Sequence, residues 1–270
     1  MRKILQGLAG VVGAGMLWSC MNVGALVHRP VMDVYDYFNP SFTRYNATSE
    51  FVPYTEFEIE YRDEDALKDL VISLENVPDY IQRVMNGLGG TVVFFDGNIC
   101  DFEELEKLEG VPMPNQEWLT WDQAPAMYDG FTKTAFIGQN QSEGWGYFYF
   151  SPALHEYGHM VDDLMGGLSI QNDFKRILDI SRKRHGLTKM SEYHMENPSE
   201  FFAGCFDRFY FSDRSKRRLM KNFPEAYWYL AELDETLYSA DLVMVGFERD
   251  IERLIDSESD RIVIDGELDL

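Results

Sequence analysis

The sequence predicts an α+β protein in which a small twisted sheet packs on a helix that carries two histidines, with a helical C-terminal subdomain. Three observations support this class: short β-branched and aromatic runs, longer segments with helix caps, and 45% hydrophobic residues in a chain of 270. A chain of this length can bury a sizeable core in one or two domains. Three cysteines cannot build a disulfide framework, so this core must hold the fold together.

The net charge of −22 narrows the range of partners. A strongly acidic surface repels phosphate, so we expect no nucleic acid as a partner. The 14% of aromatic residues argues against a disordered acidic chain. Composition therefore indicates an acidic globular protein, which we expect to be a monomer.

The first 20 residues predict an export signal. Arg2 and Lys3 precede an uncharged apolar run from Ile4 to Leu17, which is short for a membrane span. The run ends in Leu-Trp-Ser-Cys, which resembles a bacterial lipobox, with Cys20 as the lipidated residue. This predicts a lipid-anchored protein at the bacterial cell surface or in the periplasm. Cleavage at Val23-Gly24-Ala25 would instead secrete the chain, and retention of residues 4–27 would leave a single span; all three alternatives export it.

The remaining two cysteines allow two interpretations. Cys100 and Cys205 would both be available to pair in an oxidising compartment, but spacing alone cannot bring them within bridging distance. Alternatively, each is a small buried hydrophobic residue.

The elements follow in order along the chain. Residues 21–76 are interpreted as a tether and N-terminal lead-in that ends in a helix, 77–240 as the catalytic domain, and 241–270 as an acidic tail. A helix is expected after Pro78, from Asp79 to Met85, ending at Asn86-Gly87. β-branched and aromatic runs predict strands at Thr91–Phe95, Lys133–Ile137 and Gly146–Phe150.

The most informative segment begins at Ser151-Pro152, a hydroxyl N-cap followed by proline at the first helical position. Gly166-Gly167 ends this helix. His155 and His159 are four residues apart, so both imidazoles lie on one helical face and can bind one metal ion. Glu156 lies about 100° around the helix from His155, where a carboxylate can take a proton from metal-activated water.

Zn²⁺, one per chain, suits two imidazoles and one carboxylate with a fourth position open for water. Glu200 is the candidate third ligand, in the first turn of a helix that Asn197 caps and Pro198 begins. On its own, Glu200 would be interpreted as a capping-box residue that reaches back to the Asn197 backbone. The need of His155 and His159 for a carboxylate partner favours the metal role.

Three segments carry a family resemblance: HEYGHMVDD at 155–163, SEYHMENPSEFFAGCF at 191–206 and YFSDRSKRRLMKNFPEAYWYLAEL at 210–233. They resemble the catalytic domain of the anthrax lethal factor family, which includes the secreted Pro-Pro endopeptidases. The resemblance implies a zincin-like metalloprotease fold of the gluzincin kind. It implies zinc ligands His155, His159 and Glu200, with Glu156 as general base. The protein would then be a zinc endopeptidase that hydrolyses an extended peptide or protein.

The same resemblance assigns two further residues and shows one departure. Tyr193 stands seven residues before Glu200, as in the family, and would donate its hydroxyl to the oxyanion; a buried core tyrosine is the alternative. Asp162 would orient a ligand imidazole, or else is a solvated acid beside Asp163. Gly204 replaces the acid that lethal factor carries one turn after the ligand glutamate.

Substrate recognition is less strongly determined. By analogy with the family, Lys133, Thr134, Ala135, Phe136 and Ile137 are expected to form the sheet edge to which substrate adds as a strand. The acidic stretch from Asp96 to Asp129 would face the same cleft and favour cationic peptides, or is simply a solvated face. Two other functions stay open: a non-catalytic surface protein with structural zinc that binds a host or matrix partner, and an aminopeptidase.

Overall fold

The computed structural model describes residues 55–57, 73–95, 98–113, 116–138, 151–185 and 192–265. Within these ranges only the backbone is described at 55–57, 116–118, 192–193, 244 and 247–265. The expected export signal with Cys20, and the expected strand Gly146–Phe150, lie outside the described residues.

The described strands form a mixed four-stranded sheet in the order β1-β2-β6-β5. Its members are β1 (Thr55–Phe57), β2 (Thr91–Phe95), β5 (Ala126–Asp129) and β6 (Thr134–Gly138). β1 and β6 both pair with β2 in parallel, while β5 pairs with β6 in the antiparallel direction. A separate antiparallel ladder joins β3 (Pro112–Met113) to β4 (Gln116–Thr120).

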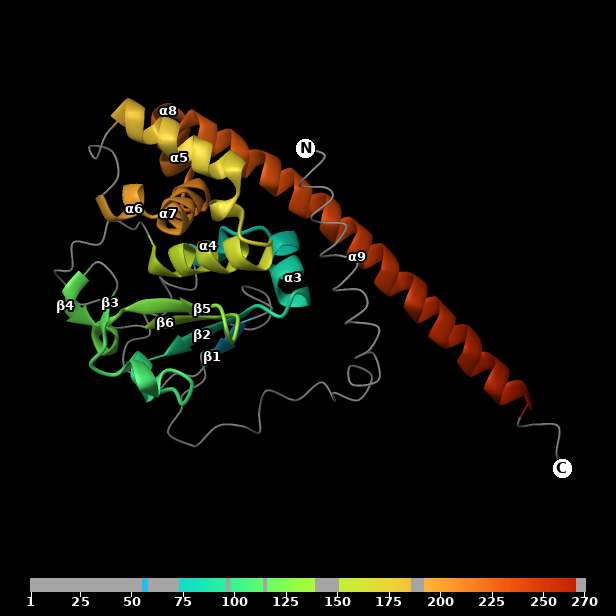
Figure 1. Cartoon of the computed structure of the whole chain (residues 1–270). Helices are drawn as coiled ribbons and strands as arrows, with labels where there is room; N and C mark the ends of the chain where they lie inside the picture. The colour runs from blue at the N-terminus through green and yellow to red at the C-terminus, as the bar shows by residue number, and fades with distance from the viewer. Residues whose placement is uncertain are drawn as a thin grey trace.

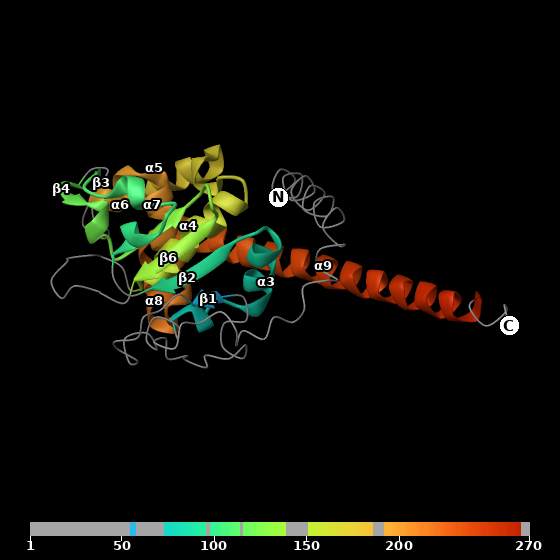
Figure 2. The ribbon, with the colours of Figure 1, turned by 90° about the horizontal axis from the view of Figure 1, so that it is seen from below.

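Helices cover one face of this sheet in two layers (Figure 1). α4 (Pro152–Leu164) lies directly on the strands, and α3 (Asp79–Gly87) lies beside it. The outer layer contains α5 (Asn172–His185), α6 (Glu192–Glu196), α7 (Pro198–Tyr210) and α8 (Asp213–Asn222). α9 (Pro224–Asp265) crosses this layer and continues away from the body of the molecule, as the view from below also shows (Figure 2).

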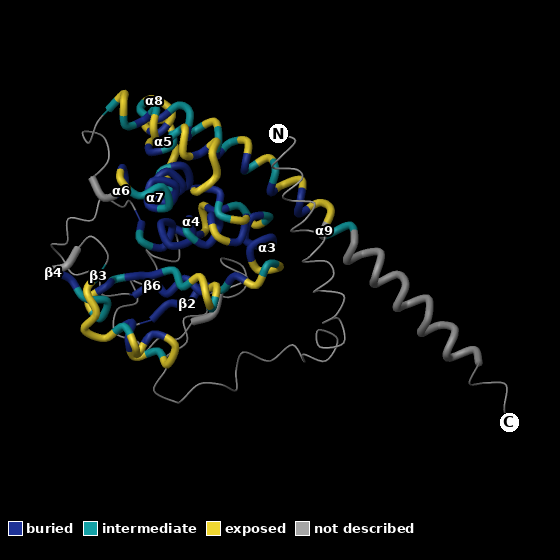
Figure 3. Tube along the Cα trace, in the orientation of Figure 1, coloured by how far each residue is buried: buried dark blue, intermediate teal, exposed yellow. Residues whose placement is uncertain are grey.

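Two hydrophobic clusters of unequal size lie on the two faces of the sheet. In β2 the side chains alternate: Val92 and Phe94 join the large cluster with the helices, whereas Val93 and Phe95 join a small cluster on the other face. α4 and α7 are buried along most of their length, at the centre of the large cluster (Figure 3). The predicted α+β class with a small sheet against the histidine-bearing helix is therefore confirmed.

The position of the expected edge strand is wrong. Residues 134–138 form β6, but β6 lies inside the sheet, paired with β2 on one side and β5 on the other. Among the described strands β5 is at this edge of the sheet. A strand's own residues show that it is buried, but which neighbours pair with it depends on distant segments.

Two features lie across the expected domain boundaries. β1 belongs to the segment 21–76 and pairs with β2, so the lead-in contributes a strand to the sheet. α9 continues without interruption through residue 240, where we placed the start of the acidic tail. Among the residues that the structure describes, no helix combines the length and apolar character needed to cross a membrane.

Candidate metal centre

Two capped helices, α4 and α7, hold the groups predicted to bind metal. The Ser151 hydroxyl accepts a hydrogen bond from the backbone N–H of Leu154 at 3.3 Å, which caps α4 as predicted. The Asn197 side chain accepts one from the backbone N–H of Ser199 at 3.0 Å and caps α7. These caps fix the first turn of each helix, and the predicted ligands His155 and Glu200 lie on those turns.

A glycine lets the two helices approach closely. A Cβ atom built on Gly158 would lie 2.9 Å from the Cα atom of Ala203 and 3.1 Å from Cβ of Phe206, closer than side chains can pack. Gly158 lies between the two histidines of the motif, so the helices touch next to the metal-binding face. This contact allows a short glutamate on α7 to reach imidazoles on α4.

The three predicted ligands converge on one point. Nε2 of His155 lies 3.0 Å from Oε2 of Glu200 and 3.2 Å from Nε2 of His159, and Nε2 of His159 lies 3.5 Å from Oε1 of Glu200. Ligand atoms about 2.0–2.1 Å from a tetrahedral Zn²⁺ are separated from each other by roughly 3.3 Å. The nitrogen–nitrogen separation, and the separation of each nitrogen from one oxygen of Glu200, are close to this value, so the donor set suits one such ion.

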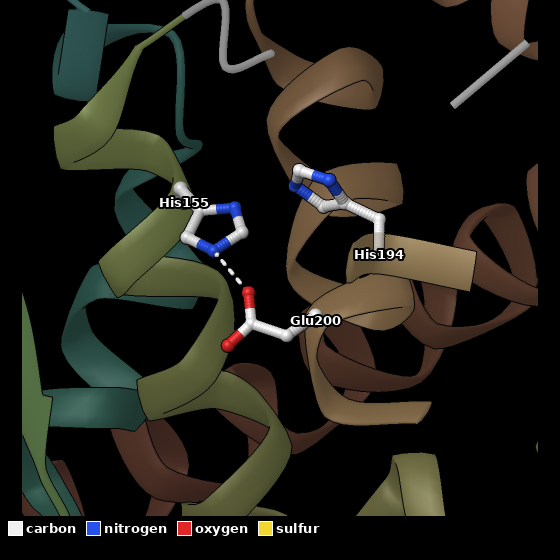
Figure 4. Close-up of side chains that lie close together, drawn as sticks. All are labelled: His155, His194 and Glu200. Carbon is white, nitrogen blue, oxygen red and sulfur yellow. Dashed lines mark hydrogen bonds and ion pairs between the residues drawn. The ribbon is translucent and has the colours of Figure 1, made fainter. Parts of the chain in front are cut away.

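A second histidine grouping lies next to the first. Single ligand atoms of His155, His194 and Glu200 lie within 4.8 Å of one another (Figure 4). His159 contacts the same two residues: its Nε2 lies 3.2 Å from Nε2 of His155 and 3.5 Å from Oε1 of Glu200, whereas His155 meets the other oxygen, Oε2. His155 and Glu200 are common to both groupings, and His159 and His194 are the two further imidazoles near them.

The charges in this site balance one another. Burial lowers the pKa of His155 to about 4, so its imidazole is neutral and keeps a lone pair for a cation. Burial also lowers the pKa of His159, but the hydrogen bond and charge of Glu200 outweigh it and raise that pKa to about 9. Burial raises the pKa of Glu200, yet both imidazoles hold it well below its usual range. Glu200 is thus an anion facing two imidazoles, a donor set suited to a divalent ion.

Glu156 has the properties of a general base. Its side chain is 9% exposed and lines the same cleft as the ligands. Burial raises its pKa to about 7, and the charge of Glu200 adds to this effect, while His159 and a backbone hydrogen bond at Tyr128 oppose it. A carboxylate with a pKa near neutrality can both accept and return a proton.

Asp162 reaches a ligand through an intermediate hydroxyl. Oγ of Ser199 lies 3.0 Å from Nδ1 of His159 and donates a hydrogen bond to Oδ2 of Asp162 at 3.2 Å. The other oxygen of Asp162 accepts the backbone N–H of Ser169 at 2.7 Å. With the Ser199 proton directed to Asp162, Nδ1 of His159 is the donor to Ser199, so Nε2 is the nitrogen that would bind a metal ion once it has lost its proton. The alternative of a fully solvated Asp162 is not what the structure shows, since this side chain is 5% exposed.

The site opens into a cleft of about 390 Å³ between helices and sheet edge. One wall carries His155, Glu156, His159 and Glu200 from α4 and α7. The opposite wall comes from β5 and its neighbours: Met113, Trp121, Pro125, Ala126, Met127 and Tyr128. The acidic lining residues besides the glutamates are Asp162 and Asp163, and no described acid between 98 and 129 lines the cleft. The expected acidic stretch at the cleft is therefore not observed in the described part of the chain.

Sequence reasoning missed two residues and one strand of the site. Ser199 had a usable signal, because it directly precedes the ligand glutamate in a capped first turn. His194 and β5 carried no local signal. Residue 193 lies in α6, but the side chain of Tyr193 is outside the described part of the structure. Cys100 and Cys205 are both free and buried, in different hydrophobic clusters, which favours the interpretation as small core residues.

Two histidines and a glutamate around one point, with a second glutamate beside them in an open cleft, define the class of HExxH metalloproteases. Comparison with known proteins supports this class. Residues 43–233 match the family described as anthrax toxin lethal factor, N- and C-terminal domain, and the chain belongs to this family. Its relatives are metalloprotease hydrolases, and this chain contains a His/His/Glu set that could bind a metal.

Individual relatives cover different parts of the chain. A Pro-Pro endopeptidase of Paenibacillus alvei is 28% identical over 165 residues, 59% of this chain and 73% of that protein. Lethal factor of Bacillus anthracis is 29% identical over 99 residues, 34% of this chain but 11% of that protein. The solved structure of a Pro-Pro endopeptidase from Paenibacillus alvei aligns with a TM-score of 0.59 and 24% identity, covering 67% of this chain and 97% of that one. This likeness supports the α+β fold.

Proposed function

We propose that the protein is an exported zinc endopeptidase with a zincin-like catalytic domain. The observation that carries the proposal is the convergence of His155, His159 and Glu200, 3.0–3.5 Å apart, at a cleft that also contains buried Glu156. Zinc held there would polarise the scissile carbonyl and activate water near neutral pH. The ligands and their separations support zinc as the cofactor, one per chain.

Two residues of the chain carry out the remaining catalytic roles, which are proton transfer and stabilisation of the oxyanion. Glu156 accepts the proton of the attacking water and delivers it to the leaving amine, which its pKa of about 7 permits in both directions. Tyr193 donates its hydroxyl to the oxyanion, where a positioned donor lowers the barrier most. The sequence interval to Glu200 and the family membership support this role for Tyr193.

We place the substrate along β5 as an added strand. β5 is the described edge strand on the cleft side, and its residues Ala126, Met127 and Tyr128 line the cleft opposite the ligands. An extended peptide can use the backbone groups of an edge strand for pairing, which places its scissile bond between β5 and α4. A preference for cationic peptides now depends on Asp163, because the described acids between 98 and 129 do not line this cleft.

Export follows from the N-terminal signal, and we propose a lipid anchor at Cys20 as the means of retention at the bacterial cell surface or in the periplasm. The cationic start, the apolar run and the Leu-Trp-Ser-Cys sequence support it. The intact mass of membrane-extracted protein distinguishes a lipidated Cys20 from cleavage near Ala25 and from an uncleaved span. A mass without added lipid would contradict the anchor.

A peptide-library digest with mass-spectrometric detection tests the enzymatic proposal and reports cleavage preference in the same experiment. The wild-type protein loaded with zinc should cleave internal bonds, and a chelator should abolish cleavage. Glu156→Ala should bind zinc and leave the library intact. Equal turnover by both proteins would refute catalysis, and would favour the alternative of a binding protein with structural zinc.

A further inference from the structure

A buried histidine lies next to the predicted metal ligands without being one of them. His194 is 2% exposed, and its ring centroid lies 5.5 Å from that of His155 with the two rings nearly perpendicular at 87°. The side chain reaches in from α6, toward the part of the His155 ring away from the nitrogen that meets Glu200 (Figure 4). His155 thus has Glu200 at Nε2 and the imidazole of His194 near its other side.

Gly204 provides the space for this imidazole. A Cβ atom at residue 204 would lie 2.8 Å from Cδ2 of His194, 3.4 Å from its Nε2 and 3.3 Å from Nη1 of Arg208. A distance of 2.8 Å is shorter than real side-chain contacts allow, so any larger residue would displace His194 or the helix. Gly204 lies one turn after Glu200 on α7. In this chain the imidazole of His194 fills the space beside that position.

The short helix that carries His194 is held firmly. Arg182 on α5 donates hydrogen bonds to the backbone carbonyls of Met195 and Glu196, the latter at 2.8 Å. Met195 is completely buried in the large cluster. The last turn of α6 is therefore held by hydrogen bonds from α5 and by the burial of Met195, and His194 is held in a defined position.

We propose that His194 is a positioning residue of the metal centre: its ring nitrogen accepts the Nδ1–H of His155 when Nε2 binds metal. The inference rests on the proposed zinc function. Metal-binding histidines usually donate their second ring N–H to an acceptor that fixes the ring and its tautomer. A neutral imidazole suits this place because the guanidinium of Arg208 lies close by and a metal dication would add a second positive charge.

Two single variants distinguish the contribution of the His194 ring nitrogen from that of the ring's shape. His194→Phe keeps an aromatic ring against His155 but has no acceptor, and His194→Gln keeps an acceptor near the position of Nε2. Zinc affinity is measured by competition with a chromophoric chelator, and the melting temperature is measured on the metal-free protein. We expect His194→Phe to lose about 10–100-fold in zinc affinity and His194→Gln to stay within about threefold of wild type.

A double variant tests the link to Gly204. Gly204→Glu alone should weaken zinc binding, because the new side chain collides with His194. His194→Ala/Gly204→Glu removes the collision and offers a carboxylate in the space that the imidazole leaves, so its zinc affinity should exceed that of His194→Ala alone and of Gly204→Glu alone. His185→Phe is the matched control: it removes a histidine that contacts Asn222 and Phe223 away from the cleft and should bind zinc as wild type does.

Each outcome of these zinc measurements either supports or overturns the positioning role of His194. Wild-type zinc affinity in His194→Phe would overturn the positioning role, as would two zinc ions per wild-type chain, which would make His194 a ligand. A loss of affinity in His194→Phe, rescue by His194→Gln and an unchanged melting temperature of the metal-free protein would support it. If wild-type protein bound zinc and cleaved no peptide, the proposed function would fail while the zinc measurements on His194 would still stand.

Discussion

The two walls of the cleft are built by different means. On the helical wall, His155, Glu156 and Glu200 are at most 9% exposed and come from two capped helices in direct contact. On the strand wall, β5 is a four-residue edge strand in which Ala126 and Met127 are buried, while Tyr128 in the strand and Trp121 before it are partly exposed. At the end of the cleft Ile170 is 63% exposed.

This contrast indicates a division between chemistry and recognition. Groups that must hold a charge or a metal ion need fixed partners in a water-poor environment, because an uncompensated buried charge is costly. Groups that recognise a substrate must stay accessible before it binds. We therefore expect changes on the helical wall to alter turnover or metal affinity, and changes on the strand wall to alter the Michaelis constant.

The largest effect is expected from Glu156→Gln on the helical wall. The amide cannot accept the proton of the attacking water, so kcat/KM should fall about 10²–10⁴-fold. Zinc should remain bound, because Glu156 lies outside the set of three ligands. The measurement is peptide cleavage together with zinc content by atomic absorption, with the exposed Glu196→Gln as control. Loss of zinc from Glu156→Gln would show that the division between base and ligands is wrong.

The sequence alone predicted the residues of the helical wall because the patterns that identify them lie within single helices. The spacing of His155, Glu156 and His159 fixes their faces on one helix, and the caps at Ser151 and Asn197 mark where helices begin. Strand β2 could be read from five consecutive residues, Thr91–Phe95. Each of these inferences needs only the periodicity of one element.

The strand wall could not be predicted in the same way. That β6 is internal and β5 is the edge depends on which strands pair, and pairing partners come from distant parts of the chain. β5 itself, AMYD, is too short to show alternation. His194 escaped notice because its position beside His155 depends on how α6 packs against α7 and α4. Long-range packing, and not the chemistry of single residues, limits what the sequence reveals here.

A smaller effect on the helical wall is expected from Ser199→Ala. The hydroxyl joins Nδ1 of His159 to the carboxylate of Asp162, and its removal leaves the imidazole free to rotate or to adopt the wrong tautomer. Zinc affinity should fall about 10–100-fold. Chelator competition measures this, with Ser239→Ala on the surface of α9 as control. If Ser199→Ala bound zinc as tightly as wild type, the relay to Asp162 would have no function.

The reaction rates of the two cysteine thiols report how often each face of the sheet opens locally. Cys205 is fully buried in the large cluster, and burial raises the pKa of its thiol to about 12. Burial also raises the pKa of the Cys100 thiol, but that residue is 6% exposed in the small cluster. In a Cys20→Ser background at pH 8, Cys100 should react with a thiol reagent at least about tenfold faster than Cys205, because small clusters open locally more often. Equal rates would mean that both faces open together, and a missing free thiol would reveal a disulfide.

The smallest effect is expected where the two walls meet. The Tyr128 hydroxyl on β5 donates a hydrogen bond to Oδ2 of Asp163 on α4 at 2.8 Å. Tyr128→Phe should let β5 move slightly relative to α4, so KM for a peptide substrate should rise about two- to fivefold, because an exposed interaction with a charged group contributes only about 0.2–1 kcal/mol. Because Tyr128 makes no contact with the metal ligands in the proposed mechanism, kcat and zinc affinity should stay unchanged. Tyr238→Phe, half exposed on α9, is the control. A fall in kcat with constant KM would place Tyr128 among the groups that act in the transition state, and the division between the walls would no longer hold.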